Sequence, residues 1–193
     1  MQPELKHIKP LMKEMNRKKK IVVSSIATIF LIILYCVIFS FSEQDGETSS
    51  GVSSLISEKC VAFLKALSGK NWSQMMVEGM AVYFENPIRK LAHFCEYALM
   101  GILLFWIWYP WVGLRKHILM QNHKRKAKIP CLLKINILWV FISACFDEIH
   151  QVFIPGRDGN IWDVLLDTAG GAFGLLICIL WVLVKKGDTN ERK

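Results

Sequence analysis

The first long apolar run of this 193-residue chain lacks any charged residue: Ile21 to Phe41 is IVVSSIATIFLIILYCVIFSF. At about 1.5 Å per residue, a run of this length forms a helix that crosses about 30 Å of hydrocarbon. The basic residues Arg17 to Lys20 before it also fit a secretory signal peptide. However, the run is longer than the usual apolar region of such a peptide, and no small-x-small cleavage site follows it. The sequence therefore predicts a transmembrane helix here.

The sequence also lacks closely spaced cysteine pairs and proline-rich linkers. The six cysteines fall one per segment and none has C-x-x-C spacing, so neither a zinc site nor a disulfide framework is indicated. There is no internal repeat and no proline-rich linker that would separate domains. The length allows one domain, and an apolar content of 53% argues against a disordered chain.

Three further apolar runs have a similar length: Leu91 to Val112, Leu132 to Phe153 and Ile161 to Val184. The net charge of +8 comes from basic blocks that flank these runs, which favours a membrane over a nucleic acid as the partner. The positive-inside rule places the blocks in the cytoplasm, with both termini inside. The predicted organisation is a basic cytoplasmic tail (1–20), a transmembrane domain (21–186) and a C-terminal cytoplasmic tail (187–193). Within the domain we expect crossings at about 21–41, 91–112, 132–153 and 161–184, an outer loop at 42–89 and a basic cytoplasmic loop at 113–131.

The predicted outer loop has a helical periodicity of its own. Apolar residues from Val52 to Leu67 follow an i, i+3, i+4 pattern after a Ser/Thr-rich start, and "NWSQ" (71–74) is typical of the start of a second helix. We expect Thr48 to Ser54 to be solvated cap residues, and Pro87 to end the second helix. Both segments are too short and too polar to span a membrane. The fold class is therefore all-α: a polytopic membrane bundle of four transmembrane helices with one or two interfacial amphipathic helices.

Polar residues gather at the ends of the crossings that this topology turns outward. His93 and Tyr97 are four residues apart, and two further polar stripes run along the third and fourth crossings. Asp147 and Asp167 lie at similar depths, roughly 10 Å and 9 Å from their helix ends at about 1.5 Å per residue. Because acids cost free energy in lipid, they should face the bundle interior or a wet cavity. A G-x-x-x-G pattern at Gly170 to Gly174 predicts close helix packing beside them.

The motifs "RKLAHFCEYALMG" and "FDEIHQVFIPGRDGNIWDVLLDTAGGAFG", together with "FSEQDGETSS", resemble the VanZ-like family of bacterial membrane proteins. The resemblance covers about Phe39 to Val184 and implies a multi-pass cell-membrane protein of the envelope, linked to tolerance of glycopeptides of the teicoplanin type. It implies no known reaction. The motif positions are Ser42, Gln44, His93, Tyr97, Asp147, Glu148, His150, Gln151, Pro155, Gly156, Arg157, Asp163, Asp167 and Gly170.

Two functions remain open at this point: an outward-facing site that acts on or binds a lipid-linked or cell-wall component, or a non-catalytic accessory protein. The catalytic candidates are His93, Asp147, Glu148, His150, Asp163 and Asp167, and the ligand-binding candidates are Gln44, Tyr97, Gln151 and Arg157. In the accessory protein, the same residues form a structural helix-packing network, in which Arg157 pairs with Asp163 or Asp158 and His93 with Asp147 or Asp167. A divalent metal is a third alternative, because histidines and acids are suitable ligands, although their spacing matches no established motif and no metal ligand is assigned. Membrane lipids are the expected partners, and neither a cofactor nor an oligomeric state is indicated.

Overall fold

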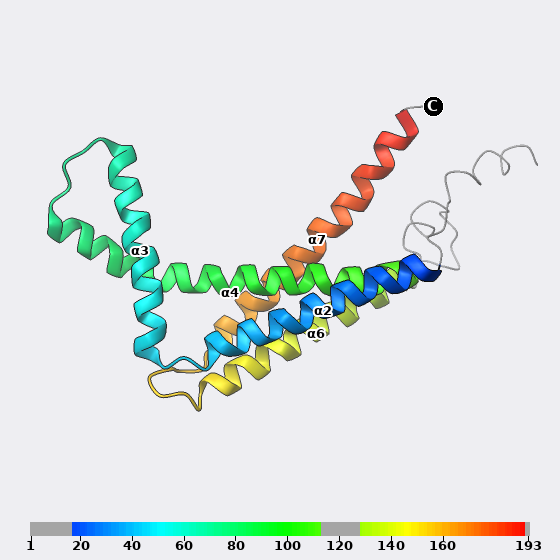
Figure 1. Cartoon of the computed structure of the whole chain (residues 1–193), viewed down its shortest axis with the longest axis horizontal. Coiled ribbons are helices and arrows are strands. Elements are labelled where there is room, and N and C mark those ends of the chain that lie inside the picture. Colours follow the sequence, from blue (N-terminus) through cyan, green and yellow to red (C-terminus); the bar gives the residue numbers. More distant parts are fainter. Residues whose placement is uncertain (1–16, 113–127, 192–193) are drawn as a thin grey trace, which may run out of the picture.

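The computed structural model of the chain describes residues 17–112 and 128–191, and all regular structure within these ranges is helical. The helices there are α2 (Arg17–Ser42), α3 (Gly46–Ser68), α4 (Gln74–Val112), α6 (Lys128–Gln151) and α7 (Ile161–Glu191). Figure 1 shows α2 and α6 extending along α4, α7 crossing them and α3 standing at one end. The predicted all-α class is confirmed, while most of the predicted N-terminal tail and cytoplasmic loop lies outside the described residues.

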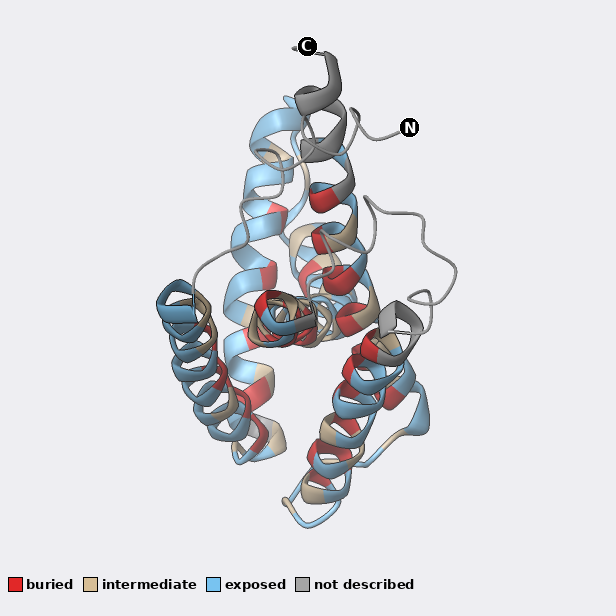
Figure 2. Cartoon of the chain, turned by 90° about the vertical axis from the view of Figure 1, so that its right-hand side faces the viewer, coloured by how far each residue is buried: buried red, intermediate tan, exposed pale blue. Residues whose placement is uncertain are grey.

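Three of the described helices are long and apolar enough to cross a membrane: α2 over Arg17–Ser42, α4 over Gln74–Trp111 and α7 over Ile161–Val182. Their outward faces are apolar. In α2, for example, Ile29 and Phe30 are more than half exposed. Figure 2 shows the exposed residues covering the outer faces, with the buried ones where the helices meet. Such a surface is typical of a membrane protein.

The third predicted crossing, at 132–153, corresponds to α6. This helix is not among the three, and it carries Lys134, Asp147 and Glu148 within its length. Both acids are buried, whereas the large exposed side chains of α6, such as Leu138 and Phe146, are apolar. The described structure thus contains three helices fit to span and a fourth whose acids face the protein.

Pro87 does not end a helix, contrary to the sequence prediction. It lies inside α4, which continues from Gln74 to Val112 without a break, and Figure 1 shows the first turns of α4 tilted relative to the rest. A proline removes one backbone donor and disfavours helical geometry in the preceding residue, but a long helix tolerates both with a bend. The predicted second interfacial helix is therefore the first part of α4.

Helix α3 forms where the outer amphipathic helix is predicted, but it packs through a different face. Asp45 caps its start by accepting a hydrogen bond from the Thr48 backbone N–H at 2.7 Å, and Gly69, at φ 62°, ends it. Ser49, Ser53 and Ser57, four residues apart, are buried. The prediction that Thr48 to Ser54 are solvated caps is therefore wrong for Ser49 and Ser53, whereas Thr48 is exposed at the capped start of the helix.

The serine face of α3 contacts α4. The Ser57 hydroxyl donates to the backbone oxygen of Ala81 in α4, while Leu55, Phe63 and Leu67 of α3 remain more than half exposed. Small side chains let two helix backbones approach closely, so the serines take the packing face and the apolar residues point outward.

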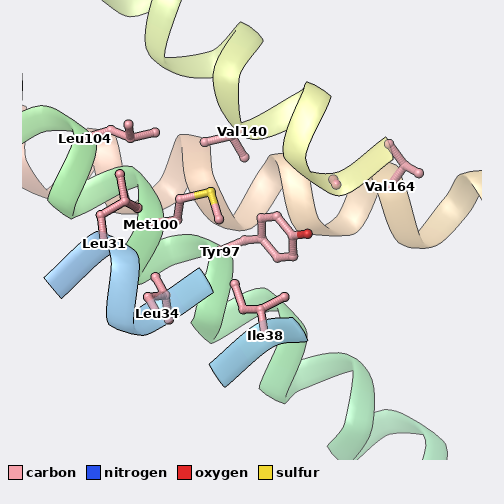
Figure 3. Close-up of a cluster of buried hydrophobic side chains, with 9 residues drawn as sticks. Leu31, Leu34, Ile38, Tyr97, Met100, Leu104, Val140 and Val164 are labelled. Atoms are coloured by element: carbon pink, nitrogen blue, oxygen red, sulfur yellow. The ribbon is translucent and has the colours of Figure 1, made fainter. Parts of the chain in front are cut away.

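The core lies between α2, α4, α6 and α7 (Figure 3). Its buried side chains are Leu31, Leu34, Ile38, Tyr97, Met100, Leu104, Val140, Ala144 and Val164. Tyr97 of α4 is almost fully buried, and its ring is surrounded by side chains of the other helices. A second cluster, around Phe105, joins α4, α6 and α7 farther along the bundle.

Glycines set the distance between α4 and α7. A Cβ on Gly174 would lie 2.0 Å from the Ala98 backbone oxygen, and one on Gly170 would lie 2.4 Å from the Phe94 oxygen. Both approaches are far below van der Waals contact, so the two backbones meet where no side chain fits. The close packing predicted for the G-x-x-x-G segment is confirmed, and it holds the first turns of α7 against the polar part of α4.

Candidate functional site

A polar cavity of about 400 Å³ opens where the start of α7, the end of α6 and the first half of α4 come together. The basic start of α2, Arg17 to Lys20, lies at the other end of the molecule (Figure 1). The cavity is lined by Asn86, Arg89, Lys90, His93, Glu148, Gln151, Gly156, Arg157, Asp158, Gly159, Asn160, Asp163, Leu166 and Asp167. We refer to it as the polar pocket.

Three basic side chains line the pocket. Arg89 and Lys90 come from α4, and Lys90 forms an ion pair with Asp163 in the first turn of α7. Arg157 comes from the loop between α6 and α7, and its guanidinium donates to the Phe41 backbone oxygen at 3.0 Å. The loop is also held by α3, because the Gly46 N–H donates to the Pro155 oxygen. The ends of α2 and α3 thus position Arg157 over the pocket.

Burial lowers the pKa of Arg157, and the neighbouring Arg89 lowers it further, while Asp147 and Glu148 act in the opposite direction. Since the pKa of a guanidinium begins far above neutrality, Arg157 remains a cation. The pocket therefore presents permanent positive charge next to its acids.

The acids of the pocket fall into two groups. Asp163 has Lys90 as its partner, and Glu148 accepts a hydrogen bond from the Asn160 N–H at 2.8 Å. Within the part of the chain that the structure describes, Asp147 accepts a single hydrogen bond, from Gln151 at 3.2 Å. Asp167 is 1% exposed, and neither of its oxygens has a hydrogen-bond partner among these residues. Two acids are therefore compensated, and two are not.

The two uncompensated acids lie together with His93. One potential ligand atom from each of His93, Asp147 and Asp167 lies within 4.8 Å of the others. The Nδ1 atom of His93 is 3.7 Å from Glu96, which is too long for a hydrogen bond. This triad joins α4, α6 and α7 at one point.

A second cavity, of about 560 Å³, lies beside the first and is mainly apolar; we call it the apolar groove. It is lined by Tyr35, Ile38, Phe39, Tyr97, Trp139, Ile142, Ser143, Phe146, Asp147 and His150, all from α2, α4 and α6. The Tyr35 hydroxyl links α2 to α6, because it bonds Ser143 at 2.6 Å and accepts from Trp139 at 2.9 Å. Asp147 lines the groove and belongs to the triad, whose other members His93 and Asp167 line the polar pocket, so the groove lies close to the pocket at this point.

The structure brings most of the sequence-predicted site residues to these two cavities. The residues that line the polar pocket are His93, Glu148, Gln151, Arg157, Asp163 and Asp167. Those that line the apolar groove are Tyr97, Asp147 and His150. The His150 ring stacks on Phe39 at 4.8 Å. Gln44 lines neither cavity.

The pairings expected of a structural network differ from those observed. Within the described residues, Asp163 pairs with Lys90 and not with Arg157, which instead bonds the backbone at Phe41. Arg89, Lys90 and Asn86 were not among the sequence-predicted site residues. The sequence spacing could have identified two of them, because Asn86 and Lys90 lie 4 residues apart and Lys90 and His93 lie 3 apart, which places them on one face of a helix.

The fold and the pocket define a helical membrane protein whose charged residues gather in a cavity at one end of a bundle. The chain belongs to the VanZ/LLP1 family, whose family model matches residues 27–182. This range extends from α2 into α7, so it includes every residue that lines the two cavities, and the resemblance drawn from the motifs is confirmed. Neither the curated proteins nor the solved structures contain a match to this chain.

Proposed function

We propose that this protein binds a lipid-linked, phosphate-bearing component of the bacterial envelope, with the head group in the polar pocket and the lipid chain in the apolar groove. The observation that carries this proposal is that Asp147, which lines the apolar groove, lies within 4.8 Å of His93 and Asp167, which line the polar pocket, so a cationic pocket and an apolar groove lie next to each other. An amphipathic ligand needs both.

The charges of the pocket favour a phosphate. Arg89 and Arg157 can each offer paired N–H donors to phosphate oxygens, and Lys90 adds a point charge. Among the described residues, Arg89 makes one long hydrogen bond, 3.4 Å, to Asn86. Its guanidinium is thus available to a ligand.

The groove favours a hydrocarbon chain that enters from the bilayer. It lies along α2 and α6, whose large exposed side chains are apolar, and aromatic and aliphatic residues such as Trp139, Ile142 and Phe146 line it. In the proposed topology α6 also crosses the membrane, as the third of four crossings, both termini are cytoplasmic and the pocket faces outward in the cell membrane. The basic start of α2 at the opposite end of the molecule supports this orientation under the positive-inside rule.

The test is a binding titration of the purified protein in phosphatidylcholine nanodiscs, with native mass spectrometry as the readout. A polyprenyl phosphate should bind at least about ten-fold more tightly than the matching polyprenol, a difference of roughly 1.4 kcal/mol. Arg89→Gln should remove this preference, while Lys59→Gln, on the exposed surface of α3, should retain it. Equal affinity for phosphate and alcohol would contradict the proposal.

Filling the groove tests the other half of the site. Ile142→Trp places a larger side chain in the groove and should weaken binding of both lipids, whereas Ile137→Trp, on another exposed face of α6, should not. Unchanged binding by Ile142→Trp would exclude the groove as the chain site.

The family relationship extends the proposal to glycopeptides of the teicoplanin type: binding of an envelope lipid would change how cells tolerate these compounds. In cells that express the protein at matched membrane abundance, Arg89→Gln should lower teicoplanin tolerance and Lys59→Gln should not. If tolerance follows abundance alone in all variants, the accessory role, in which the polar residues only pack helices, is the better account.

A further inference from the structure

His93, Asp147 and Asp167 offer three ligand atoms from three different helices at one point of the bundle. A metal ion held at 2.0–2.2 Å by tetrahedral ligands places its ligand atoms roughly 3.3–3.6 Å apart. The triad atoms lie within 4.8 Å of one another. Side-chain rotations that bring them about 1 Å closer would let all three hold one ion.

The triad contains buried polar atoms without a hydrogen-bond partner. Asp167 is 1% exposed, and among the described residues both of its carboxylate oxygens lack a partner, as does Nδ1 of His93. A charged carboxylate in such a place is costly, so a buried acid is either protonated or compensated by a cation. No lysine or arginine in the described ranges lies within ion-pair distance of Asp147 or Asp167. The basic residues of the pocket therefore do not supply that cation.

We infer that His93, Asp147 and Asp167 bind a single divalent transition-metal ion, Zn²⁺ or Mn²⁺. One imidazole nitrogen with two carboxylate oxygens suits these borderline ions better than Mg²⁺ or Ca²⁺, which prefer oxygen ligands alone. Three protein ligands leave coordination positions open to water or to a ligand, as in catalytic and not structural zinc sites. The hydrogen bond from Gln151 holds Asp147 in orientation for the ion.

This inference is independent of lipid binding, because the triad would hold its ion whether or not the groove is occupied. It also explains why the sequence spacing matches no metal motif: the ligands come from α4, α6 and α7, and only helix packing brings them together.

The test is metal binding by the purified full-length protein in detergent after treatment with EDTA and dialysis. Titration with ZnCl₂ and MnCl₂, followed by metal analysis of the desalted protein, should give one ion per chain, with at least about ten-fold weaker binding of Mg²⁺ and Ca²⁺. Asp167→Asn should weaken binding at least ten-fold. Glu58→Gln, at an exposed acid of α3 outside both cavities, should leave it unchanged.

Two outcomes would overturn the inference: less than one fifth of an ion per wild-type chain, or equal affinity in wild type and Asp167→Asn. A second measurement does not depend on a folded variant. Co²⁺ added to the wild-type protein should produce visible absorption bands typical of mixed nitrogen and oxygen ligation, and Zn²⁺ should abolish them by displacement. Absence of these bands in folded protein would also contradict the site.

Discussion

Glu148 has a local structural task that can be separated from any chemistry. Its carboxylate accepts a hydrogen bond from the Asn160 N–H and so closes the loop between α6 and α7. Glu148→Gln retains an acceptor oxygen and should keep the thermal unfolding temperature near that of the wild type. Glu148→Ala leaves a buried donor without a partner and should cost about 1–3 kcal/mol.

Thermal unfolding of the purified variants in one detergent measures this difference, with the exposed Glu43→Ala as the control. If Glu148→Gln destabilises the protein as much as Glu148→Ala does, stability requires the negative charge itself. The role of Glu148 is then more than accepting the hydrogen bond from Asn160.

Asp45 gives a pH-dependent prediction at the same scale. Its hydrogen bonds with Thr48 lower the pKa of the cap carboxylate below its ordinary value. A carboxylate whose folded pKa is lowered stabilises the protein at pH values above its unfolded pKa, near 4, and this stabilisation is lost as the pH falls through the lowered pKa.

Asp45→Asn keeps a good cap without the charge. The difference in unfolding temperature between the wild type and Asp45→Asn should favour the wild type at pH 7 and shrink below about pH 4. Thermal scans across this range measure it, and a constant difference at all pH values would show that the charge contributes nothing.

At the scale of helices, the crossing of α4 and α7 holds the site together. Gly174→Ala places a methyl group 2.0 Å from the backbone oxygen of Ala98, which cannot yield as a flexible side chain would. We expect a loss of about 1–3 kcal/mol of stability from the overpacked contact. Because the same crossing brings His93 and Asp167 together, metal binding should weaken in parallel.

Gly79→Ala is the matched control, since Gly79 is also a helical glycine, in α4, and nothing beyond its own turn of helix lies within 4 Å of the place that its new methyl group would take. Alanine favours helix more than glycine, so this variant should be neutral or up to about 1 kcal/mol more stable. Equal behaviour of the two variants in thermal unfolding would mean that the α4–α7 contact has room for a methyl group.

The orientation of the whole molecule can be tested with its own cysteines. Cys60 is exposed on α3, at the pocket end of the molecule. A variant that keeps Cys60 and replaces the other five cysteines should react with a membrane-impermeant maleimide in intact cells. Arg17→Cys in a background without cysteines should react only after the cells are opened.

The reverse pattern, with Arg17→Cys labelled from outside and Cys60 protected, would contradict the proposed topology. Labelling of both sites in intact cells would contradict a membrane crossing between them, because α2 is the candidate membrane-spanning helix between Arg17 and Cys60.

Much of the fold could be predicted from the sequence because helices depend on local patterns. The uncharged run at 21–41 and the apolar periodicity after Val52 predict α2 and α3, and the Gly170 to Gly174 segment predicts close packing. The errors arose where long-range contacts overrode a local rule. α4 continues through Pro87 because a bend suffices, and Ser49 is buried because small residues favour close helix contact.

Residue type and spacing alone were enough to predict the long apolar helices. They also predicted that the ionisable residues concentrate near a few helix ends. Its motifs also indicated the family. Which of these charges compensate one another depends on the tertiary structure. Within the described residues, Lys90 forms an ion pair with Asp163, and the Asn160 N–H donates to Glu148. The crossing of α4 with α7 leaves Asp167 buried beside His93 without a hydrogen-bond partner. The rotation and separation of packed helices decide such pairings, and glycines that are far apart in the sequence set both.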